Sequence, residues 1–326
     1  MSLVSPASAP LELDSHTLRI VRAIAEAGSI TAAAAALGFS QPAISQHLKR
    51  AEQRIGMPIV TRVGRGVRLT EAGRVLARHA GTITTALDAA AGELAELSGL
   101  RAGRVRVVAF PSASPTLVPR LLGTLSRVHP GIGISYLEAE PPEAVEAVRE
   151  QRAELAITFS YPGDRIDPHK ESARGLVVAP LWRDEMMLAV PDAHPAASPS
   201  SVDLKSLAGD RWIAGCIRCR GHLLQLADEA GFEPSIAYET DNFVAVLGMV
   251  AAGLGVALIP SLAIDAASVP PGVSIRPTRN HDARTIHLVG AAGSDQVPAI
   301  AATAQAIVEL DTSTWRLVPA ADKAIR

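Results

Sequence analysis

The chain has 326 residues, so we expect two or three structural units rather than one ordinary domain. A hydrophobic fraction of 48% is enough to fill cores of that size and excludes a mostly disordered chain. The net charge of -2 argues against a uniformly basic nucleic-acid binder, but the charge is unevenly spread. Residues 40–70 carry six Lys and Arg against one Asp or Glu, a local positive patch of the kind that DNA binding requires.

Two features bear on the compartment. The chain has two cysteines, Cys216 and Cys219, so no disulfide framework is expected and a cytoplasmic location is favoured. Residues 1–13 lack the basic and apolar regions of a signal peptide and are expected to form a flexible tail. Residues 243–260 carry no charge, but they contain three glycines, so a helix, a turn and a buried strand are expected rather than a membrane span.

Residues 29–56 have the spacing of a helix-turn-helix. Ser29 or Thr31 is placed to cap a short Ala-rich helix, and Gly38 can end it in the left-handed conformation. Ser40 is placed to cap the next helix, with Pro42 in its first turn, where a missing N–H does no harm.

The second helix of this motif has one apolar face and one polar face. The apolar residues recur at steps of three or four and predict a core: Ile44, Leu48, Ala51 and Ile55. The outward face carries Gln41, Ser45, Gln46, Lys49 and Arg50. Amides can hydrogen-bond adenine edges and cations can bind phosphates, so this face suits a major groove. An ordinary solvated helix face is the alternative, which the caps, the glycine turn and the following basic segment disfavour.

That basic segment, residues 58–70, contains two short β-prone pieces around Gly64, Arg65 and Gly66. It predicts a β-hairpin wing whose arginines, Arg62, Arg65 and Arg68, reach the DNA backbone or the minor groove.

Residues 70–98 predict one long helix, because no proline interrupts them and Ala and Leu are abundant. Its apolar residues follow a heptad repeat, with one position held by Gly73, Ala80, Leu87 and Leu94 and the other by Leu76, Ile83, Ala90 and Leu97. Such a seam predicts a coiled coil between two chains. Packing of this helix on its own effector domain is the alternative.

From Arg104 onward, strand and helix patterns alternate, which predicts a parallel α/β fold. Two lobes joined by extended strands near residues 170–185 would leave a cleft between them. Ligands of such folds lie at strand ends and helix N-termini. Turns of this kind hold Ser112, Ser114, Phe159, Ser160, Thr240, Asp241 and Phe243. Each polar one could instead be a helix cap.

Residues 212–222 hold an unusual cluster of side chains beside a predicted helix start. Arg218, Arg220 and His222 there suit an anionic effector such as a carboxylate, with Cys219 beside them. Cys216 and Cys219 form a CxxC pair, which supplies only two of the four ligands that zinc needs, so no metal is expected. Neighbouring cations could lower a thiol pKa, so thiol-based redox sensing by this pair remains an alternative.

Residues 14–73 resemble the N-terminal domain of LysR-type transcriptional regulators. The matching positions are Gly28, Ser29, Thr31, Ala32, Ala33, residues 40–48, Glu52, Ile55, Gly56, Arg62, Leu69, Thr70, Ala72 and Gly73. Departures are apolar for apolar: Ala51 stands where the family usually has Leu, and Ile59 and Val60 replace Leu and Phe. The resemblance extends over the whole chain, because that family also carries a linker helix and an effector domain.

The resemblance implies roles for residues of the motif. Bases would be approached by Gln41, Pro42, Ser45 and Gln46. Phosphates would be held by Ser29, Thr31, Ser40, Lys49 and Arg50, whereas Arg62 is in part structural. The implied partners are double-stranded DNA at an interrupted palindrome, a small-molecule effector and a second copy of the chain through the linker helix. A tetramer through the effector domains is also implied, as is RNA polymerase where the protein activates transcription.

The expected architecture is therefore α/β, with a winged helix-turn-helix over residues 14–69, a linker helix over 70–98 and an effector domain over 104–326. The effector domain is expected to resemble type 2 periplasmic binding proteins. Lobe I would span about 104–179 and 280–326, and lobe II about 180–279.

Two other functions fit the sequence less well. An enzyme is disfavoured because the chain lacks a Gly-rich phosphate loop, GxSxG and HExxH, and no cofactor is expected. A solute-binding protein would need a signal peptide and has no use for a helix-turn-helix. The effector, the operator and the choice between activation and repression are left open by the sequence.

Overall fold

The computed structural model describes residues 13–63, 66–97, 103–163 and 175–320. The chain divides into two compact units, residues 1–94 and 95–326, each with its own core. Among the described residues, no helix is both long and apolar enough to cross a lipid bilayer.

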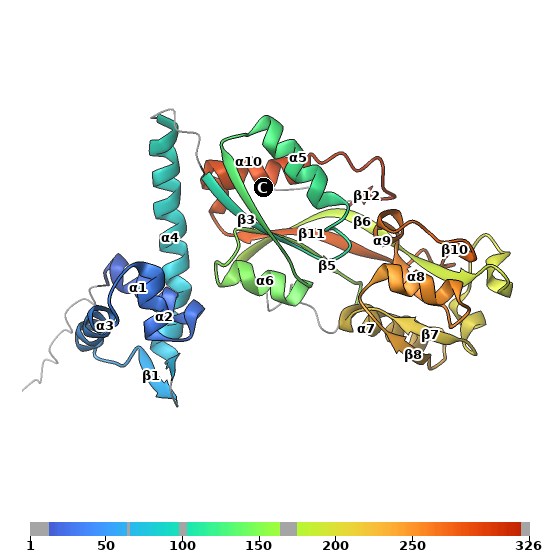
Figure 1. Ribbon diagram of the computed structural model, residues 1–326, viewed down its shortest axis with the longest axis horizontal. Helices are drawn as coiled ribbons and strands as arrows, with labels where there is room; N and C mark the ends of the chain where they lie inside the picture. Colours follow the sequence, from blue (N-terminus) through green and yellow to red (C-terminus); the bar gives the residue numbers. More distant parts are fainter. Residues whose placement is uncertain (1–12, 64–65, 98–102, 164–174, 321–326) are drawn as a thin grey trace, which may run out of the picture. The chain divides into compact units, whose positions relative to one another are not determined.

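The N-terminal unit is a helical domain with a two-stranded wing (Figure 1). Its elements are α1 (Ser15–Ala27), α2 (Ile30–Leu37), α3 (Gln41–Ile55), β1 (Val60–Val63), β2 (Gly66–Leu69) and α4 (Glu71–Leu97). β1 and β2 pair antiparallel, with Val60 opposite Leu69. The apolar face predicted for α3 is buried, and it packs with Ile20 and Ile24 of α1 in one core. The predicted helix-turn-helix and wing are therefore confirmed.

The first half of α4 belongs to the core of this unit. Leu76 and Ala80 are buried among the side chains of α1 and α3. Gly73 lies so close to the wing that a Cβ atom there would stand 2.2 Å from the carbonyl oxygen of Ile59. At the N-terminal end of α4, the apolar seam that was predicted to contact a partner chain therefore packs inside the same unit. Farther along, Ile83 and Leu87 are 40% and 53% exposed; the side chains of Leu94 and Leu97 lie outside the described residues.

The C-terminal unit begins with the predicted βαβαβ run. Its elements are β3 (Gly103–Ala109), α5 (Leu117–Val128), β4 (Ile132–Glu138), α6 (Pro141–Arg149) and β5 (Leu155–Ser160). β3 pairs in parallel with both β4 and β5. Helices α5 and α10 (Pro298–Val308) cover one face of this sheet, and α6 covers the other (Figure 1).

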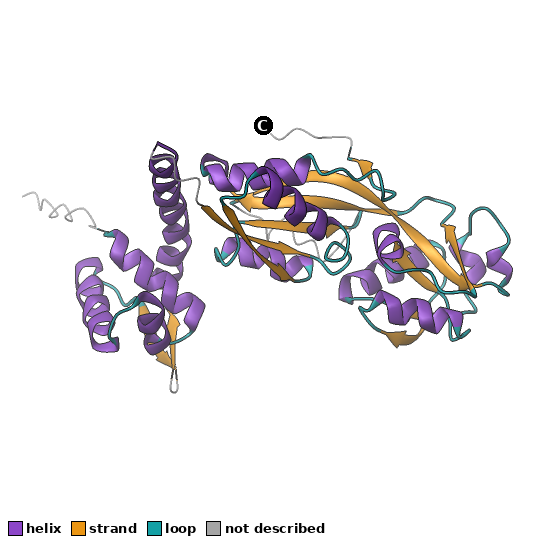
Figure 2. Cartoon of the chain, turned by 45° about the horizontal axis from the view of Figure 1, so that its top comes forward, coloured by secondary structure: helices purple, strands orange, loops and turns teal. Residues whose placement is uncertain are grey.

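Two long strands join the lobes of this unit (Figure 2). β6 (Leu176–Pro191) pairs antiparallel with β11 (Ala283–Ala291) as far as Glu185. From Met186 onward it pairs with β9 (Ala257–Pro260) and β10 (Val273–Pro277) of the second lobe. The short β12 (Val318–Pro319) also pairs with β6, and β11 pairs with β5. One strand therefore runs through both lobes without a break, and its partners change at Met186.

The second lobe surrounds its own apolar core. Its remaining elements are the 3-10 helices η1 (Pro195–Ala197) and η2 (Leu204–Leu207), β7 (Arg211–Ala214), α7 (Ile217–Glu229), β8 (Ser235–Glu239), α8 (Phe243–Ala251) and α9 (Ser261–Ala266). A further 3-10 helix, η3 (Ser294–Gln296), precedes α10. β7 and β8 are parallel. α7 starts within the cluster at residues 212–222, and Cys216 is its N-cap.

Candidate functional site

The turn between α2 and α3 presents the polar face of α3 to solvent. Ser29 caps α2 by accepting from the amide of Ala32 at 3.1 Å. Gly38 takes a positive φ of 71° at the end of α2, where a side chain would strain the backbone. Ser40 then caps α3, so only three residues separate the two helices.

Most of the described residues predicted to contact DNA are exposed to solvent. Gln41, Pro42, Gln46, Lys49 and Arg50 are exposed on α3, and Ser45 is half-buried. The amide of Gln41 donates to the Ser45 hydroxyl at 2.9 Å, which fixes the side chain in a solvent-facing position. On the neighbouring segments, Thr31 and Ser40 are exposed and Ser29 is half-buried.

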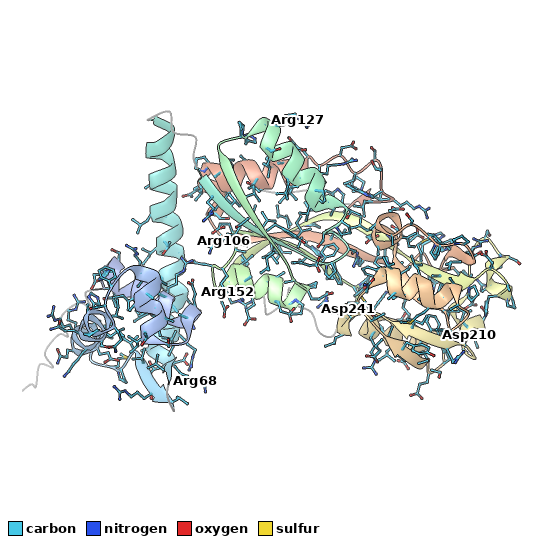
Figure 3. All side chains as sticks on the ribbon, viewed as in Figure 1. Arg68, Arg106, Arg127, Arg152, Asp210 and Asp241 are labelled. Carbon is cyan, nitrogen blue, oxygen red and sulfur yellow. The ribbon has the colours of Figure 1, made fainter. Side chains whose placement is uncertain are left out.

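The wing adds two described arginines to this surface. Arg62 on β1 and Arg68 on β2 are exposed, and Figure 3 shows Arg68 projecting from the wing. Arg65 lies outside the described residues. The carboxylate of Glu52 accepts from the amides of Ile59 and Val60 at 2.8 and 3.2 Å, so the end of α3 holds the start of the wing.

A polar cluster that the sequence did not suggest anchors α3 to α1. Asp14 caps α1, accepts from Thr17 and forms an ion pair with Arg54 at the end of α3. Burial raises the pKa of Asp14, but the hydrogen bonds from Thr17 and Arg54 outweigh it, and the pKa falls below its ordinary value. The ring of His47 on α3 lies 2.9 Å from the Thr17 hydroxyl and packs edge-on against His16. Burial, followed by the nearby His16, lowers the pKa of His47.

A small pocket lies between the two lobes of the C-terminal unit. Its enclosed space is about 10 Å³, roughly the room that one water molecule needs. It is lined by Phe110, Pro111, Ser112, Glu140, Phe159, Cys216, Cys219, Asp241, Phe243 and Arg284. The lining residues come from the ends of β3, β4 and β5, from β11, and from the first turns of α7 and α8. Asp241, labelled in Figure 3, lies at the lobe junction directly before α8.

A buried ion pair forms the floor of this pocket. Arg284 on β11 donates from Nε to the Asp184 carboxylate on β6 at 2.9 Å, and these two residues are 1% and 0% exposed. Arg284 also donates to the Ser112 hydroxyl at 2.7 Å. The other oxygen of Asp184 accepts from the Ser261 hydroxyl and from the Leu262 amide. Every partner needed to keep this pair charged in a low-dielectric interior is therefore present.

Two aromatic rings enclose the guanidinium of Arg284. It lies over the rings of Phe110 and Phe159 at 4.8 and 4.4 Å from their centroids. Burial lowers the pKa of Arg284, but the Asp184 carboxylate outweighs burial and the pKa lies above its ordinary value. The cation is therefore permanent.

Cys216 and Cys219 face each other in the first turn of α7. Both are free thiols, and their sulfur atoms are 2.9 Å apart. The amide of Cys219 donates to the Cys216 sulfur at 3.4 Å, and the Tyr161 hydroxyl donates to the Cys219 sulfur at 3.5 Å. Burial raises the pKa of Tyr161, so its phenol keeps its proton.

The two thiols have different surroundings. The hydrogen bond from Cys216, the phenol of Tyr161 and the charge of Arg284 lower the pKa of Cys219, against the effect of burial. The hydrogen bond to Cys219, together with burial and the charges of Cys219 and Glu140, raises the pKa of Cys216. Cys219 therefore loses its proton more readily than Cys216. Low-pKa thiolates at helix N-termini are the reactive form of cysteine.

A carboxyl group at the start of α6 completes the pocket. Glu140 lines the pocket together with Cys216, and its Oε2 atom is buried without a hydrogen-bond partner among the described residues. Burial, followed by the charge of Asp241, raises the pKa of Glu140. Arg284 is paired with Asp184, and the other charged groups of the pocket lining, Glu140 and Asp241, are acidic.

Half of the predicted effector residues line this pocket: Ser112, Phe159, Cys219, Asp241 and Phe243. The others do not line it. Arg218 is buried, lies over the Phe159 ring and donates to its carbonyl oxygen, and Arg220 is exposed and paired with Glu239. The expected anionic effector held by these two arginines therefore has no counterpart in the pocket.

The remaining predicted residues have local partners. The Ser114 hydroxyl is hydrogen-bonded to the Tyr136 hydroxyl, and the Ser160 hydroxyl is hydrogen-bonded to the His287 ring. Thr240 accepts from the amide of Asn242. Glu140 and Arg284 also line the pocket and were not predicted from the sequence. Glu140 lies in the turn from β4 into α6, which is of the same kind as the turns that hold the predicted residues, so the sequence does carry a signal for it. Arg284 lies within a strand and carries no such signal.

Both units of the chain match models of known protein families. A family model described as the LysR substrate binding domain matches residues 98–311. The model of the bacterial regulatory helix-turn-helix protein, lysR family, matches residues 15–74. The chain is 27% identical over 265 residues to the HTH-type transcriptional activator CmpR of Synechocystis sp., covering 79% of this chain and 83% of the relative. It is 26% identical over 282 residues to a hydrogen peroxide-inducible genes activator of Dickeya chrysanthemi, covering 85% of this chain and 89% of the relative.

Solved structures share the fold. A full-length OxyR variant from Pseudomonas aeruginosa matches with a TM-score of 0.73 at 24% identity, covering 96% of this chain and 99% of that one. Full-length CbnR in complex with its target DNA matches with a TM-score of 0.51 at 22% identity, covering 90% of this chain and 98% of that one.

Breaking the buried ion pair should destabilise the C-terminal unit strongly. We expect Arg284→Met alone or Asp184→Leu alone to lower the free energy of unfolding by about 3–5 kcal/mol, because each leaves an uncompensated buried charge. The double variant should lose less than the sum of the two. Urea unfolding measures all three, with Glu150→Gln of an exposed ion pair as the control that changes stability by less than about 1 kcal/mol. Additive losses would contradict a direct interaction.

Proposed function

This chain belongs to the LysR family of DNA-binding transcriptional regulators, and we propose that it reads a palindromic operator as a dimer through α3 and the wing. The exposed polar face of α3 carries this proposal. It offers two amides, Gln41 and Gln46, on a helix whose opposite side is fully committed to the core. A helix with one polar face and one buried apolar face can lie in a major groove without exposing apolar surface.

Base contacts and phosphate contacts are expected from different residues. Gln46 is exposed and Gln41 is held by Ser45, so both amides can meet base edges. Lys49, Arg50 and the wing arginines provide positive charge around them, which suits the phosphates on either side of the groove.

The dimer is inferred from the uncovered part of α4. Ile83 and Leu87 are one helical turn apart and largely exposed, and Ala90 continues the same stripe. A second copy of α4 packed there would bury this stripe and pair two recognition helices for the two halves of a palindrome. A tetramer through the C-terminal units, and contact with RNA polymerase if the protein activates transcription, extend this proposal by family likeness alone.

Substitutions on α3 should separate base reading from phosphate binding. We expect Gln46→Ala to weaken binding to the operator by about 1–3 kcal/mol, roughly 5- to 150-fold, with little change for scrambled DNA. Lys49→Ala should weaken both alike and reduce the salt dependence by about one charge. Mobility-shift titrations on DNA flanking the gene measure this, with Arg19→Ala on α1 as the control for loss of an exposed cation. Equal losses on both DNAs for Gln46→Ala would count against base reading.

A charge on the exposed stripe of α4 should break the dimer. We expect Leu87→Asp to give monomers, or tetramers reduced to dimers, and to lower operator affinity, because a buried carboxylate in an apolar seam is unpaired. Thr82→Asp places the same charge on an exposed site off the stripe and should change neither property. Sedimentation equilibrium and mobility shifts measure both. Undiminished assembly and affinity in Leu87→Asp would exclude this interface.

A second function, thiol-based redox sensing, is favoured by the 2.9 Å distance between the two sulfur atoms. A disulfide needs about 2.05 Å, so closure requires only a small movement of the two side chains. Cys216 and Cys219 both line the pocket, whose enclosed space is about 10 Å³, so any oxidant that reaches the sulfur atoms through it must be small. Among the relatives, one is named a hydrogen peroxide-inducible genes activator, which agrees with this proposal.

The proposed reaction oxidises the two thiols by two electrons and reduces one hydroperoxide. A cysteine thiolate attacks one peroxide oxygen, the O–O bond breaks, and the alkoxide or hydroxide takes a proton from solvent. The resulting sulfenic acid is attacked by the second sulfur, the S–O bond breaks, and hydroxide leaves as water. Overall, two thiols and a hydroperoxide give a disulfide, an alcohol or water, and a further water.

Redox control predicts a reversible change in operator affinity. The chain has two cysteines, so hydrogen peroxide should reduce its free thiols from two to none, and dithiothreitol should restore them. Operator affinity should change by about 5-fold or more between the two states, the usual size of a coupling between sites. Cys216→Ser should abolish the change, and an untreated sample of the same variant controls for the substitution. Affinity that is indifferent to both reagents would remove redox sensing and leave the DNA-binding function intact.

A further inference from the structure

The two sulfur atoms have different neighbours. A carboxyl group lies near Cys216, whereas a hydroxyl group and a cation act on Cys219. Glu140 lines the pocket together with Cys216. Tyr161 donates to Cys219, and the charge of Arg284 acts on that sulfur. The α7 N-terminus favours a thiolate at either position, so these neighbours decide between them.

We propose that Cys219 is the sulfur that attacks the oxidant and that Glu140 accepts the proton of Cys216 when the disulfide closes. This inference rests on the redox sensing proposed above and assigns its two steps to named groups. Cys219 is half-buried and can meet an oxidant, whereas Cys216 is only 9% exposed. The more accessible sulfur therefore reacts first, and the buried sulfur resolves the intermediate.

Glu140 suits the second step because of where it lies. After Cys219 has become a sulfenic acid, the Cys216 thiol must lose its proton to attack, and it is buried away from water. The Glu140 carboxyl group lines the same small pocket as Cys216, and its Oε2 atom is buried without a hydrogen-bond partner among the described residues. The proton then passes to Glu140, the Cys216 thiolate attacks the sulfur of Cys219, and the departing hydroxide takes the proton back from Glu140 as water.

The surroundings of Glu140 strengthen it as a proton acceptor. Burial, followed by the charge of Asp241 on the α8 side, raises its pKa, and Glu143 on its own helix adds to this. The charge of Arg284 on β11 acts in the opposite direction and is outweighed. A carboxylate with a raised pKa takes up a proton more readily than an ordinary one, which favours transfer from Cys216.

The test follows each step separately in the full-length protein. Reduced protein is treated with iodoacetamide over a range of pH, and the labelled sulfur is identified by mass spectrometry. Cys219 should react first and faster than an ordinary cysteine at neutral pH, and it should do so equally in Glu140→Gln. Two single variants then compare the oxidation of each sulfur by hydrogen peroxide, with dimedone to trap the sulfenic acid. Cys219 should be labelled in Cys216→Ser. Cys216 should be labelled at least about tenfold more slowly in Cys219→Ser. Preferential labelling of Cys216 would overturn the assignment of the attacking sulfur.

Disulfide closure tests Glu140. Glu140→Gln should slow closure at pH 7 by at least about tenfold, the lower range for loss of a general base, with a rate that rises as pH increases. Glu140→Asp should recover part of the rate, and Glu146→Gln removes an exposed carboxylate from the same helix as the matched control. Closure in Glu140→Gln at the wild-type rate and pH dependence would overturn this role while leaving redox sensing standing. A disulfide that forms as described but does not alter operator affinity would reject redox sensing and leave both assignments standing.

Discussion

The buried ion pair between Asp184 and Arg284 is the interaction on which the C-terminal unit depends. The two residues lie on β6 and β11, close to Met186, where β6 exchanges its partners in one lobe for those in the other. A charged pair in such an interior is tolerated only where its remaining donors and acceptors are satisfied. Ser112 of one lobe and Ser261 of the other supply those hydrogen bonds, so a single polar network fixes how the two lobes meet.

The same cation influences the chemistry of the pocket. Arg284 is held by Asp184, and its charge still lowers the pKa of Cys219. The groups around the dithiol come from both lobes: Glu140 follows β4 and Tyr161 follows β5, whereas both cysteines belong to α7. A change in the charge or bonding of the sulfur atoms therefore alters contacts that cross the lobe junction. Coupling between thiol state and lobe arrangement needs no additional element, because both depend on one set of contacts.

The sequence predicted those parts of the structure that depend on near neighbours along the chain. Ser29, Gly38 and Ser40 act on residues within three or four positions, so their capping roles could be read directly. The pocket depends on contacts between distant segments, and topology decides which of them meet. Arg218 illustrates the limit: its place at a helix start suggested an exposed cation, yet it turns back against Phe159. The position of a residue on a helix sets the direction in which its side chain leaves the helix, but it does not show which groups from distant segments lie in that direction.

The apolar stripe on α4 shows how one sequence pattern can serve two partners. Leu76 and Ala80 pack into the same core as Ile44 of α3, while Ile83 and Leu87 continue the stripe into solvent. Heptad spacing alone cannot tell these halves apart, because an intramolecular core and a second chain demand the same periodicity. Their continuity has a mechanical consequence. Suppose that two copies of the chain pair along the outer half of α4. The inner half of each α4 is packed into the core of its own N-terminal unit, so a rotation of one α4 against the other also rotates that core and α3 with it.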